Sequence, residues 1–577
     1  MTSNRVVIDP VTRIEGHLRV EAQVAGGRVT DAWSSATMWR GIEIIVRNRD
    51  PREAWLFAQR ICGVCTTVHA LASVRAVEDA LDIQVPVNAE YLRQLIGLSQ
   101  YVHDHVVHFY HLQALDWVDV TSALKADPAK TADIQAKLSD YPQGGAGHFS
   151  AVRDKLRSFV AGGNLGPFTN GYWGHPAYKL PPEVNLLAVS HYLDALTFQR
   201  DFVRIHAFLG GKNPHPQTYL VGGMARAIDL NSDDAINDGV LAELELLLDN
   251  GLNFVTQALV PDVLAIASYY RDWSGIGAGV GNYMSFGEFS STGKPPRGGD
   301  PSRTDLLFPP GIVLARDLSK VHPVDPTKIT EQIARSWYKY SGGDDKPLNP
   351  FDGETTPHYT GPEPPYEFLD VENRYTWLKA PRYDGQVMEV GPLARMVVGY
   401  AGGNTRIREL VGHALAQLGL QPTALFSTLG RVLARAVETQ LAAERALEVL
   451  AALRANIASG DTRVFDDSKW HPSSWPKHAR GVGFHGAPRG ALSHWVEITD
   501  GKVSNYQAVV PTTWNASPRD AAGQRGPYEA SLIGTPVHDR TQPLEILRTL
   551  HSFDPCMACA AHIIDEDGAE LYEVRVT

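Results

Sequence analysis

The stretch from residue 423 to residue 458, TALFSTLGRVLARAVETQLAAERALEVLAALRANIA, carries the strongest secondary-structure signal in the chain. It begins after Pro422 and stops before Gly460, two residues that commonly stand just outside the ends of a helix. Its apolar residues recur mostly at steps of three and four, at Leu425, Leu429, Val432, Leu433, Val437, Leu441, Leu450 and Leu453. This spacing predicts one long helix with an apolar face.

Three other segments show similar spacing and predict further helices over residues 87–118, 184–209 and 236–259. In the first of them the apolar positions are Leu92, Leu95, Ile96, Val102, Val106 and Phe109. Apolar and polar residues instead alternate over residues 5–35, around a Gly-Gly turn, which predicts a β-hairpin or a small meander.

Two long segments, 290–301 and 341–365, are rich in glycine or proline and are expected to be irregular. The sequence contains no internal repeat and no change in composition that marks a domain boundary. The expected fold class is therefore α-dominated α+β, with a large helical body and small peripheral β-sheets.

The composition is that of an ordinary globular protein of 577 residues with a formal net charge of −12. This charge argues against a nucleic-acid-binding protein, which needs a basic face for phosphates. We find no N-terminal signal peptide, because Asp9 interrupts the first apolar run, and no run of about 18 apolar residues. Taken alone, these features favour a cytoplasmic protein, unless a partner carries the export signal.

All four cysteines lie in two Cys-x-x-Cys pairs, RICGVC at residues 60–65 and DPCMACAAH at residues 554–562. Two cysteines at this spacing can face one ion, and four soft thiolates suit zinc, nickel, copper(I) or an iron–sulfur cluster. A structural zinc site with four cysteine ligands or a redox dithiol are the general alternatives. Zinc ribbons, however, pair their cysteines within roughly 15–20 residues. Here the pairs lie near the two ends of the chain.

With their surroundings, the two cysteine pairs resemble the metal-binding motifs of nickel–iron hydrogenase large subunits. The resemblance covers the whole chain, and five other segments match family segments in the right order. These are RIEGH (13–17), RGIE (40–43), HDHVVHFYH (103–111), APRG (487–490) and VPTTWN (510–515). The resemblance implies the large-subunit fold of that family and the reaction H₂ ⇌ 2H⁺ + 2e⁻. The sequence group it is most like is the membrane-bound uptake hydrogenases.

The resemblance also implies a metal centre of nickel and of iron carrying one CO and two CN⁻ ligands. By analogy Cys65 and Cys559 bridge the two metals, whereas Cys62 and Cys556 are terminal on nickel. Cys556 is also a candidate base for the proton released from H₂. Glu15 matches the glutamate that relays this proton outward, and the alternative for Glu15 is an ion pair with Arg13 or another nearby cation.

Further site residues follow from the same resemblance. Arg489 is expected over the open face of the metal site, held by Asp104 and Asp554, with an ordinary buried Arg–Asp network as the alternative. The other expected neighbours of the metals are Pro488 and Pro511, which line a dry pocket, Thr512, which donates a hydrogen bond to a cyanide, and His69, which lies near a bridging sulfur.

A magnesium ion is implied near the C-terminus, bound by Glu43, by the backbone carbonyl of Ala508 and by His562. The histidines of the 103–111 segment are not carried over as nickel or iron ligands. For these we favour roles in the polar core or toward a partner, at His103, His105, His108 and His111.

Mature members of the family end at the histidine that corresponds to His562, and this chain continues for 577 − 562 = 15 residues. The resemblance implies a single catalytic unit over residues 1–562 and a propeptide over residues 563–577. An endopeptidase removes such a tail after nickel-insertion factors have loaded the metal. The tail is expected to hold Cys556 and Cys559 open until then.

The chain has no spare cysteines for iron–sulfur clusters, so the electrons require a separate iron–sulfur small subunit in a heterodimer. The resemblance to uptake enzymes implies a membrane cytochrome b and the periplasmic side of the membrane, reached with the small subunit. Other possibilities are the related subunit of NADH–quinone oxidoreductase, which generally lacks the four cysteines, and a large zinc-stapled structural protein. A nucleotide-dependent dehydrogenase is suggested only by the GxGxxG pattern at residues 481–486.

Overall fold

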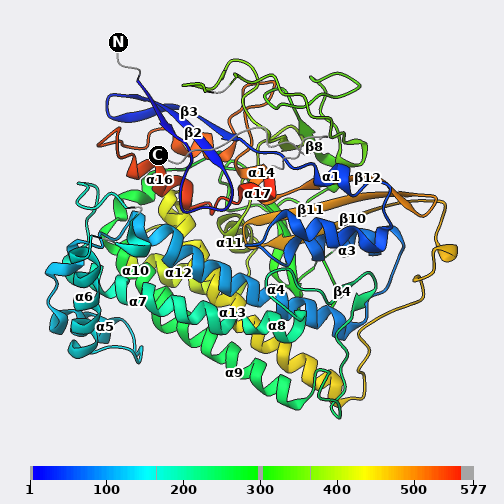
Figure 1. Ribbon diagram of the computed structural model, residues 1–577, viewed down its shortest axis with the longest axis horizontal. Coiled ribbons are helices and arrows are strands. Elements are labelled where there is room, and N and C mark those ends of the chain that lie inside the picture. Colours follow the sequence, from blue (N-terminus) through cyan, green and yellow to red (C-terminus); the bar gives the residue numbers. More distant parts are fainter. Residues whose placement is uncertain (1–3, 164, 170, 297–302, 364, 561–577) are drawn as a thin grey trace.

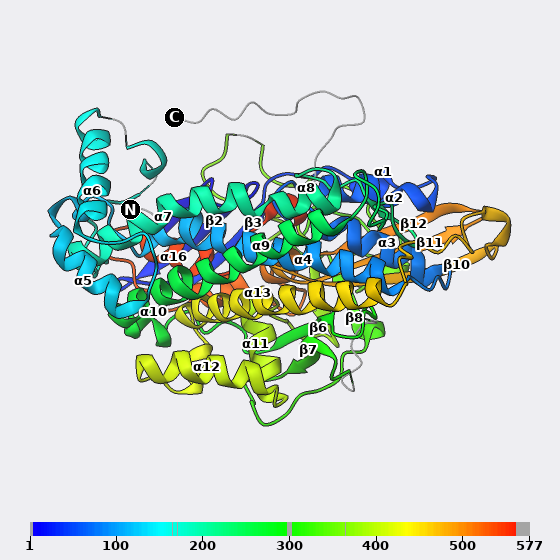
Figure 2. The ribbon, with the colours of Figure 1, turned by 90° about the horizontal axis from the view of Figure 1, so that it is seen from below.

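The computed structural model describes residues 4–163, 165–169, 171–296, 303–363 and 365–560. Its centre is a set of long helices that lie side by side in Figure 1 and Figure 2. The longest helix, α13, packs against α4, α9 and α11, and α7 packs against α4 and α9. The bounds of these helices are Val87–Val107 (α4), Pro182–Phe202 (α7), Asp238–Phe254 (α9), Pro392–Ala401 (α11) and Thr428–Ala458 (α13). The predicted helix-dominated fold is confirmed.

Helix α13 begins where its sequence supplies a cap. The Ser427 hydroxyl accepts a hydrogen bond from the Gly430 N–H at 2.9 Å, which satisfies one of the first free N–H groups of the helix. Residues 423–427, predicted as part of the helix, mostly form a separate short turn, η11 (Pro422–Leu425). The C-terminal end comes at Ala458, two residues before Gly460, whose positive φ of 95° ends the helical path.

The other predicted helices also form, but their ends differ from the predicted ones. Helix α4 continues through a π-helical turn, η3 (His108–Gln113), and a 3₁₀ turn, η4 (Ala114–Asp116), so the predicted helix over 87–118 is nearly continuous. The predicted 184–209 helix divides into α7 and α8 (Arg204–Gly210). The predicted 236–259 helix is longer than expected, because η7 (Val255–Leu259) leads directly into α10 (Val260–Tyr269).

Among the described residues, the run from Asp238 to Tyr269 is the one helical stretch long and apolar enough to match a membrane span. Half of its most apolar part is buried inside the fold, where α9 and α10 pack against α13 and α7. Packing in a helical core accounts for this composition. The remaining helices are α1 (Ile42–Ile45), α2 (Ala54–Ala58), α3 (Val68–Ala80), α5 (Pro128–Leu138), α6 (Ala146–Ala161), α12 (Thr405–Leu418), α14 (Pro511–Asn515), α15 (Pro527–Leu532), α16 (Leu544–His551) and α17 (Met557–Ala560).

Small antiparallel sheets surround the helices, as expected. The predicted N-terminal meander is a three-stranded sheet of β1 (Arg5–Ile8), β2 (Leu18–Ala25) and β3 (Arg28–Ala36). A second three-stranded sheet, of β10 (His478–Ala487), β11 (Gly490–Thr499) and β12 (Lys502–Val509), lies against α3 (Figure 1). The two-stranded sheets pair β4 (Tyr219–Leu220) with β5 (Gly223–Met224), β6 (Tyr283–Ser290) with β7 (Leu306–Val313), and β8 (Ile329–Gln332) with β9 (Ala380–Tyr383).

The GxGxxG pattern lies inside strand β10 and not in a turn that leads into a helix. Its glycines allow close packing on α3, because a Cβ added to Gly483 would lie 1.9 Å from the carbonyl oxygen of Ala72. The dinucleotide-binding interpretation is therefore excluded. The predicted irregular segment 341–365 contains, where described, only the 3₁₀ turn η10 (Pro350–Asp352) and isolated bridges. Of the segment 290–301, the residues from 297 onward lie outside the described part.

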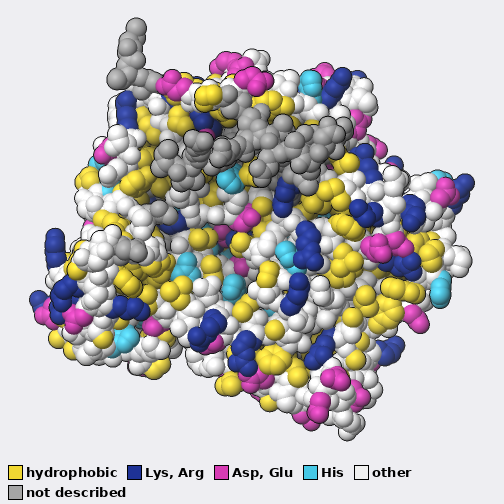
Figure 3. All heavy atoms as spheres, viewed as in Figure 1, with side chains coloured by type: hydrophobic (Ala, Val, Ile, Leu, Met, Phe, Trp, Pro, Cys, Tyr) yellow, Lys and Arg dark blue, Asp and Glu magenta, His cyan; other side chains and the backbone are white. Residues whose placement is uncertain are grey.

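A separate apolar cluster joins the two ends of the chain. Val20 and Ala22 of β2 pack there with Tyr528 of α15 and with Ile546 and Leu550 of α16. All five side chains are buried. Because burying a Val, Ile or Leu side chain stabilises the fold by about 1.5–3 kcal/mol, this cluster holds the N-terminal sheet against the C-terminal helices. On the face shown in Figure 3, basic side chains are scattered among acidic ones.

Candidate metal centre

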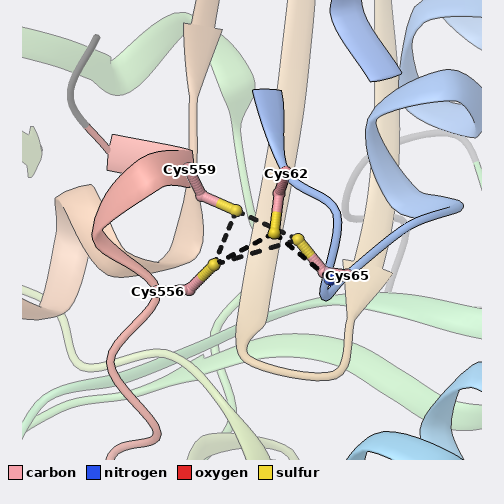
Figure 4. A group of neighbouring side chains, drawn as sticks. All are labelled: Cys62, Cys65, Cys556 and Cys559. Atoms are coloured by element: carbon pink, nitrogen blue, oxygen red, sulfur yellow. Dashed lines mark hydrogen bonds between the residues drawn. The ribbon is translucent and has the colours of Figure 1, made fainter. Parts of the chain in front are cut away.

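The four cysteines converge in the interior, although about 490 residues separate the two pairs. Cys62 and Cys65 lie in the turn before α3, whereas Cys556 precedes α17 and Cys559 lies in it. Their Sγ atoms point toward one another (Figure 4). The Sγ–Sγ distances are 3.4 Å for Cys62 and Cys556, 3.0 Å for Cys65 and Cys559, 2.9 Å for Cys556 and Cys559, and 4.0 Å for Cys65 and Cys556.

Backbone pairing with the RIEGH segment fixes the second cysteine pair. The Met557 N–H donates to the Glu15 carbonyl at 2.7 Å, and the Glu15 N–H donates to the Pro555 carbonyl at 3.3 Å. Gly16 makes this approach possible, since its φ is +78° and an added Cβ would lie 2.6 Å from the Ala558 nitrogen. The N-terminal segment therefore positions the C-terminal ligand loop.

By themselves, the four buried thiols do not all ionise readily to thiolates. Burial raises the pKa of Cys65 to about 11, and burial also raises the pKa values of Cys556 and Cys559 well above their usual range. Burial acts in the same direction on Cys62, but hydrogen bonds from the other three thiols outweigh it and lower the Cys62 pKa. A soft cation at the centre removes this obstacle, because thiolates are its preferred ligands. A metal–sulfur bond of about 2.3 Å implies sulfur separations of roughly 3.8 Å. The separations of 3.4 and 4.0 Å approach this value, whereas those of 2.9 and 3.0 Å are shorter.

A small cavity adjoins Cys65, Cys556 and Cys559, and Cys62 does not line it. Other predicted site residues line this cavity, namely His69, Pro488, Arg489, Pro511 and Thr512. The Thr512 hydroxyl oxygen accepts the Cys556 N–H at 3.2 Å, so its own hydrogen remains free to be donated. A closed structural zinc site does not need such a cavity beside its ligands.

Arg489 lies at the turn between β10 and β11, and two carboxylates hold its guanidinium. Its Nη1 is 3.2 Å from Asp104 Oδ2, and its Nη2 is 3.0 Å from Asp554 Oδ1. All three side chains are buried. Burial would lower the pKa of Arg489, but Asp554 and the neighbouring thiols outweigh burial and raise the pKa. The guanidinium group therefore stays charged. The expected clamp of Arg489 by Asp104 and Asp554 is present.

Glu15 contacts the cysteine pair directly. Its Oε2 accepts the Ala558 N–H at 2.8 Å and lies 3.4 Å from Cys556 Sγ. Burial, followed by the charge of Cys62, raises the pKa of Glu15. The alternative ion pair with Arg13 does not form, because Arg13 has a positive φ of 55° and pairs with Asp116.

His69 lies on the other side of the sulfurs, where its Nε2 is 3.3 Å from Cys559 Sγ. Its Nδ1 is 3.0 Å from His494 Nε2, and His494 Nδ1 is 2.5 Å from the Tyr506 hydroxyl. Sequence reasoning missed His494 and Tyr506. Nothing local distinguishes these two residues, which alternate along β11 and β12 like ordinary core positions.

The residues expected to bind magnesium also come together where described. Glu43 of α1 accepts the Ala508 N–H at 2.9 Å, and both line a cavity of about 40 Å³ with Glu331 and Lys379. Lys379 Nζ is 3.7 Å from Glu43 and 3.4 Å from Glu331. Burial raises the pKa of Glu331 to about 7. His562 lies outside the described residues, and sequence reasoning missed Glu331 and Lys379.

The histidines of the 103–111 segment bind protein groups. His105 Nε2 is 2.9 Å from Glu438, His108 Nε2 is 2.7 Å from the His551 carbonyl, and His111 Nε2 is 3.2 Å from the Tyr192 carbonyl. His103 Nδ1 is 3.5 Å from Asp104. Among the described residues, the four cysteines are the group whose ligand atoms lie close enough together to hold one metal ion.

Known proteins resemble this chain along its whole length. Residues 40–562 match the family described as nickel-dependent hydrogenase, and residues 5–36 match one described as HoxL-like. The chain is 50% identical to the uptake hydrogenase large subunit of Rhizobium leguminosarum bv. viciae, over 100% of this chain and 98% of that protein. It is 47% identical to the hydrogenase-1 large chain of Escherichia coli K12, over 99% and 97%.

Solved structures agree with the sequence relatives. The nickel–iron–selenium hydrogenase of Desulfovibrio vulgaris Hildenborough in its reduced state superimposes with a TM-score of 0.73 at 34% identity, over 97% of this chain and 99% of that one. The four-cysteine site therefore fits nickel and iron, and a zinc staple in a structural protein is not favoured. With its fold, its cysteines and its full-length relatives, the chain belongs to the nickel-dependent hydrogenases as a large subunit.

Proposed function

We propose that the chain is the catalytic subunit of an uptake hydrogenase, which oxidises H₂ to two protons and two electrons. The observation that carries this proposal is the convergence of four buried Sγ atoms beside a cavity that Arg489 also lines. The names of the relatives, uptake hydrogenase and hydrogenase-1, support the direction of H₂ oxidation.

The proposed centre contains nickel and an iron that carries one CO and two CN⁻ ligands. Cys62, Cys65, Cys556 and Cys559 would hold this centre; by the family resemblance Cys62 and Cys556 would bind nickel alone, and Cys65 and Cys559 would bind both metals. The cavity adjoins Cys65, Cys556 and Cys559 and leaves room beside them for a second metal, whereas Cys62 does not line it. When bound, the metal pair supplies the hydride-accepting and electron-accepting chemistry. Pro488 and Pro511 keep water away from the diatomic ligands, and Thr512 donates its free hydroxyl hydrogen to one of them.

The protein residues move the proton away. Cys556 Sγ holds it first, and Glu15 Oε2, at 3.4 Å, receives it. The raised pKa of Glu15 suits this task, because burial makes this carboxyl take up a proton more readily than an ordinary glutamate. Arg489, fixed by Asp104 and Asp554, presents a positive charge to the open side of the site, where it orients and polarises H₂.

A magnesium ion is proposed between Glu43, the Ala508 carbonyl and His562. Supporting this, the cavity there brings two carboxyl groups, of Glu43 and Glu331, to a single ammonium group of Lys379. A divalent cation with oxygen ligands offsets the remaining negative charge.

We also propose that residues 1–562 form one catalytic unit and that an endopeptidase removes residues 563–577 after nickel-insertion factors have acted. Hydrogenase large subunits pair with a small subunit, and here the small subunit carries iron–sulfur clusters that receive the electrons. Membrane association on the periplasmic side, export together with the small subunit and a cytochrome b as the electron acceptor fit the uptake-type relatives.

The test is an infrared spectrum of the purified heterodimer, together with an assay of H₂ uptake. One CO band, two CN⁻ bands and H₂-dependent dye reduction are expected from protein whose mass shows loss of 15 residues. Processed protein with equimolar nickel but without these bands contradicts the proposal. Protein that keeps its tail is expected to lack activity.

A further inference from the structure

A continuous chain of hydrogen bonds leads away from Cys559 into the protein interior. From Cys559 Sγ it passes to His69 (3.3 Å), from His69 to His494 (3.0 Å), and from His494 to the Tyr506 hydroxyl (2.5 Å). Tyr506 in turn donates to Ser73 Oγ at 2.8 Å. None of these side chains is more than 5% exposed.

The direction of this chain depends on the state of the sulfur. With a thiol, the S–H donates to His69 Nε2, each histidine donates to its neighbour, and Tyr506 donates to Ser73, as the structure has it. A metal-bound thiolate has no proton to donate and accepts only. His69 must then carry its hydrogen on Nε2, and His494 must carry its hydrogen on Nε2 to donate to His69 Nδ1.

In the thiolate state His494 Nδ1 becomes an acceptor, and the Tyr506 hydroxyl is its partner at 2.5 Å. A hydroxyl hydrogen rotates freely between acceptors, so Tyr506 can turn from Ser73 to His494 without moving its ring. Burial raises the pKa of Tyr506, which keeps this hydrogen in place. The 3.0 Å contact between His69 Nδ1 and His494 Nε2 needs one donor and one acceptor, so each neutral ring has one N–H to place.

We propose that Tyr506 and His494 are positioning residues that fix the tautomer of His69, so that its Nε2–H donates to the bridging sulfur of Cys559. The inference rests on the proposed function, because it concerns the metal-loaded thiolate. A hydrogen bond to a metal-bound sulfur withdraws electron density from it, and such bonds are a main control of redox potential at sulfur-ligated centres.

The chain does not serve as a second proton exit. It ends at Ser73 in the middle of α3, a residue without measurable exposure. Glu15, in contrast, contacts the sulfur of a different cysteine, Cys556. The two hydrogen-bond systems therefore have different roles. Glu15 accepts protons at Cys556, and the His69–His494–Tyr506 chain controls the electron density at Cys559.

The experiment compares Tyr506→Phe, Ser73→Ala and wild type as purified heterodimers with equal nickel content. Tyr506→Phe keeps the ring and removes the hydroxyl that donates to His494 Nδ1. The tautomer with Nε2–H on both rings then loses its terminal partner, and the N–H···S bond weakens. We expect its CO and CN⁻ bands to move to lower wavenumber and the midpoint potential of the centre to fall. His69→Ala is expected to shift the bands in the same direction.

Ser73→Ala is the matched control, because Ser73 receives no hydrogen bond from Tyr506 in the loaded state. Its bands and potential are expected to coincide with those of wild type. Bands of Tyr506→Phe that coincide with wild type would overturn the inference, as would equal shifts in both variants. Absence of CO and CN⁻ bands from processed wild-type protein would instead reject the proposed function and the inference with it.

Discussion

Two buried polar regions of this protein compensate for the loss of water around polar groups in opposite ways. Around Arg75, in the helical body, charges neutralise one another, since Arg75 lies 2.7 Å from Glu90 and 3.2 Å from Glu288. Arg93 is likewise 2.6 Å from Glu78. This ion-pair network links α3, α4 and β6.

The metal centre is buried to the same degree, but its four thiols face mainly one another. Three of them resist ionisation because of burial, and no cationic side chain lies within hydrogen-bond distance of any Sγ atom among the described contacts. A buried polar group that is satisfied by protein partners serves the fold. A buried set that is satisfied only by an added ion marks a ligand site. The contrast predicts that substitutions in the two regions affect different measured quantities.

The largest effect is expected from Cys65→Ser. Replacing a soft thiolate by a hydroxyl removes a preferred ligand, so nickel content and H₂ uptake both fall below detection. The free energy of unfolding of the metal-free chain changes by only about 1 kcal/mol, the typical cost of a point substitution. Metal analysis and urea unfolding check this. Stoichiometric nickel with substantial activity in the variant contradicts the assignment of Cys65 as a ligand.

Glu15→Gln comes next, because it removes the proton acceptor while preserving shape. We expect H₂ uptake to fall roughly 100-fold to 10,000-fold, with nickel content and infrared bands retained. Glu15→Asp, which keeps a carboxyl group at a greater distance, is expected to retain part of the rate. A rate for the glutamine variant within a few-fold of wild type would show that the proton leaves by another route.

Arg75→Met tests the ion-pair network around Arg75. It leaves Glu90 and Glu288 underpaired in the interior, and breaking a buried pair in this way costs about 3–5 kcal/mol. The free energy of unfolding should fall accordingly, while nickel per folded molecule stays unchanged. Arg406→Met is the control, because Arg406 and Glu444 form a partly exposed pair at 2.6 Å worth about 0–1 kcal/mol. Equal losses in both variants would refute the comparison.

The smallest effect is a pH dependence of stability. Burial would raise the pKa of Glu288, but Arg75 and His485 outweigh it and lower the pKa to about 2. Since the folded pKa lies below the ordinary value of 4.5, this contribution is fully present above pH 4.5 and is lost as the pH falls toward 2. The loss is on the order of 1 kcal/mol per pH unit. Urea unfolding of wild type and Glu288→Gln should show a flatter acid limb for the variant.

Patterns along the sequence predicted the helical body, the N-terminal meander and the convergence of the two cysteine pairs. They failed at helix ends and where contacts are long-range. The predicted 236–259 helix was stopped too early, because the π-helical turn η7 lets α10 begin with Pro261 in its first turn without a break. The predicted 423–458 helix began too early, because the cap lies at Ser427 and not at Pro422.

Within the site, local neighbours were a poor guide to partners. Arg13 is two residues from Glu15, yet it pairs with Asp116, 103 positions away. His494 is 425 positions from His69, and nothing in its own segment indicates that contact. Periodicity identifies which face of an element is buried, but not which buried polar groups meet across elements.

Because Glu15 pairs with the loop that carries Cys556, the metal site can form only late in biosynthesis. Cys65 and Cys556 are 491 positions apart, so at synthesis rates of about 5–20 residues per second the first cysteine pair waits roughly 25–100 s for the second. During that interval the emerging chain offers two free thiols and no pocket to protect them. The topology therefore sets the order of events, because synthesis must pass Cys559 before the four-thiolate metal site can exist.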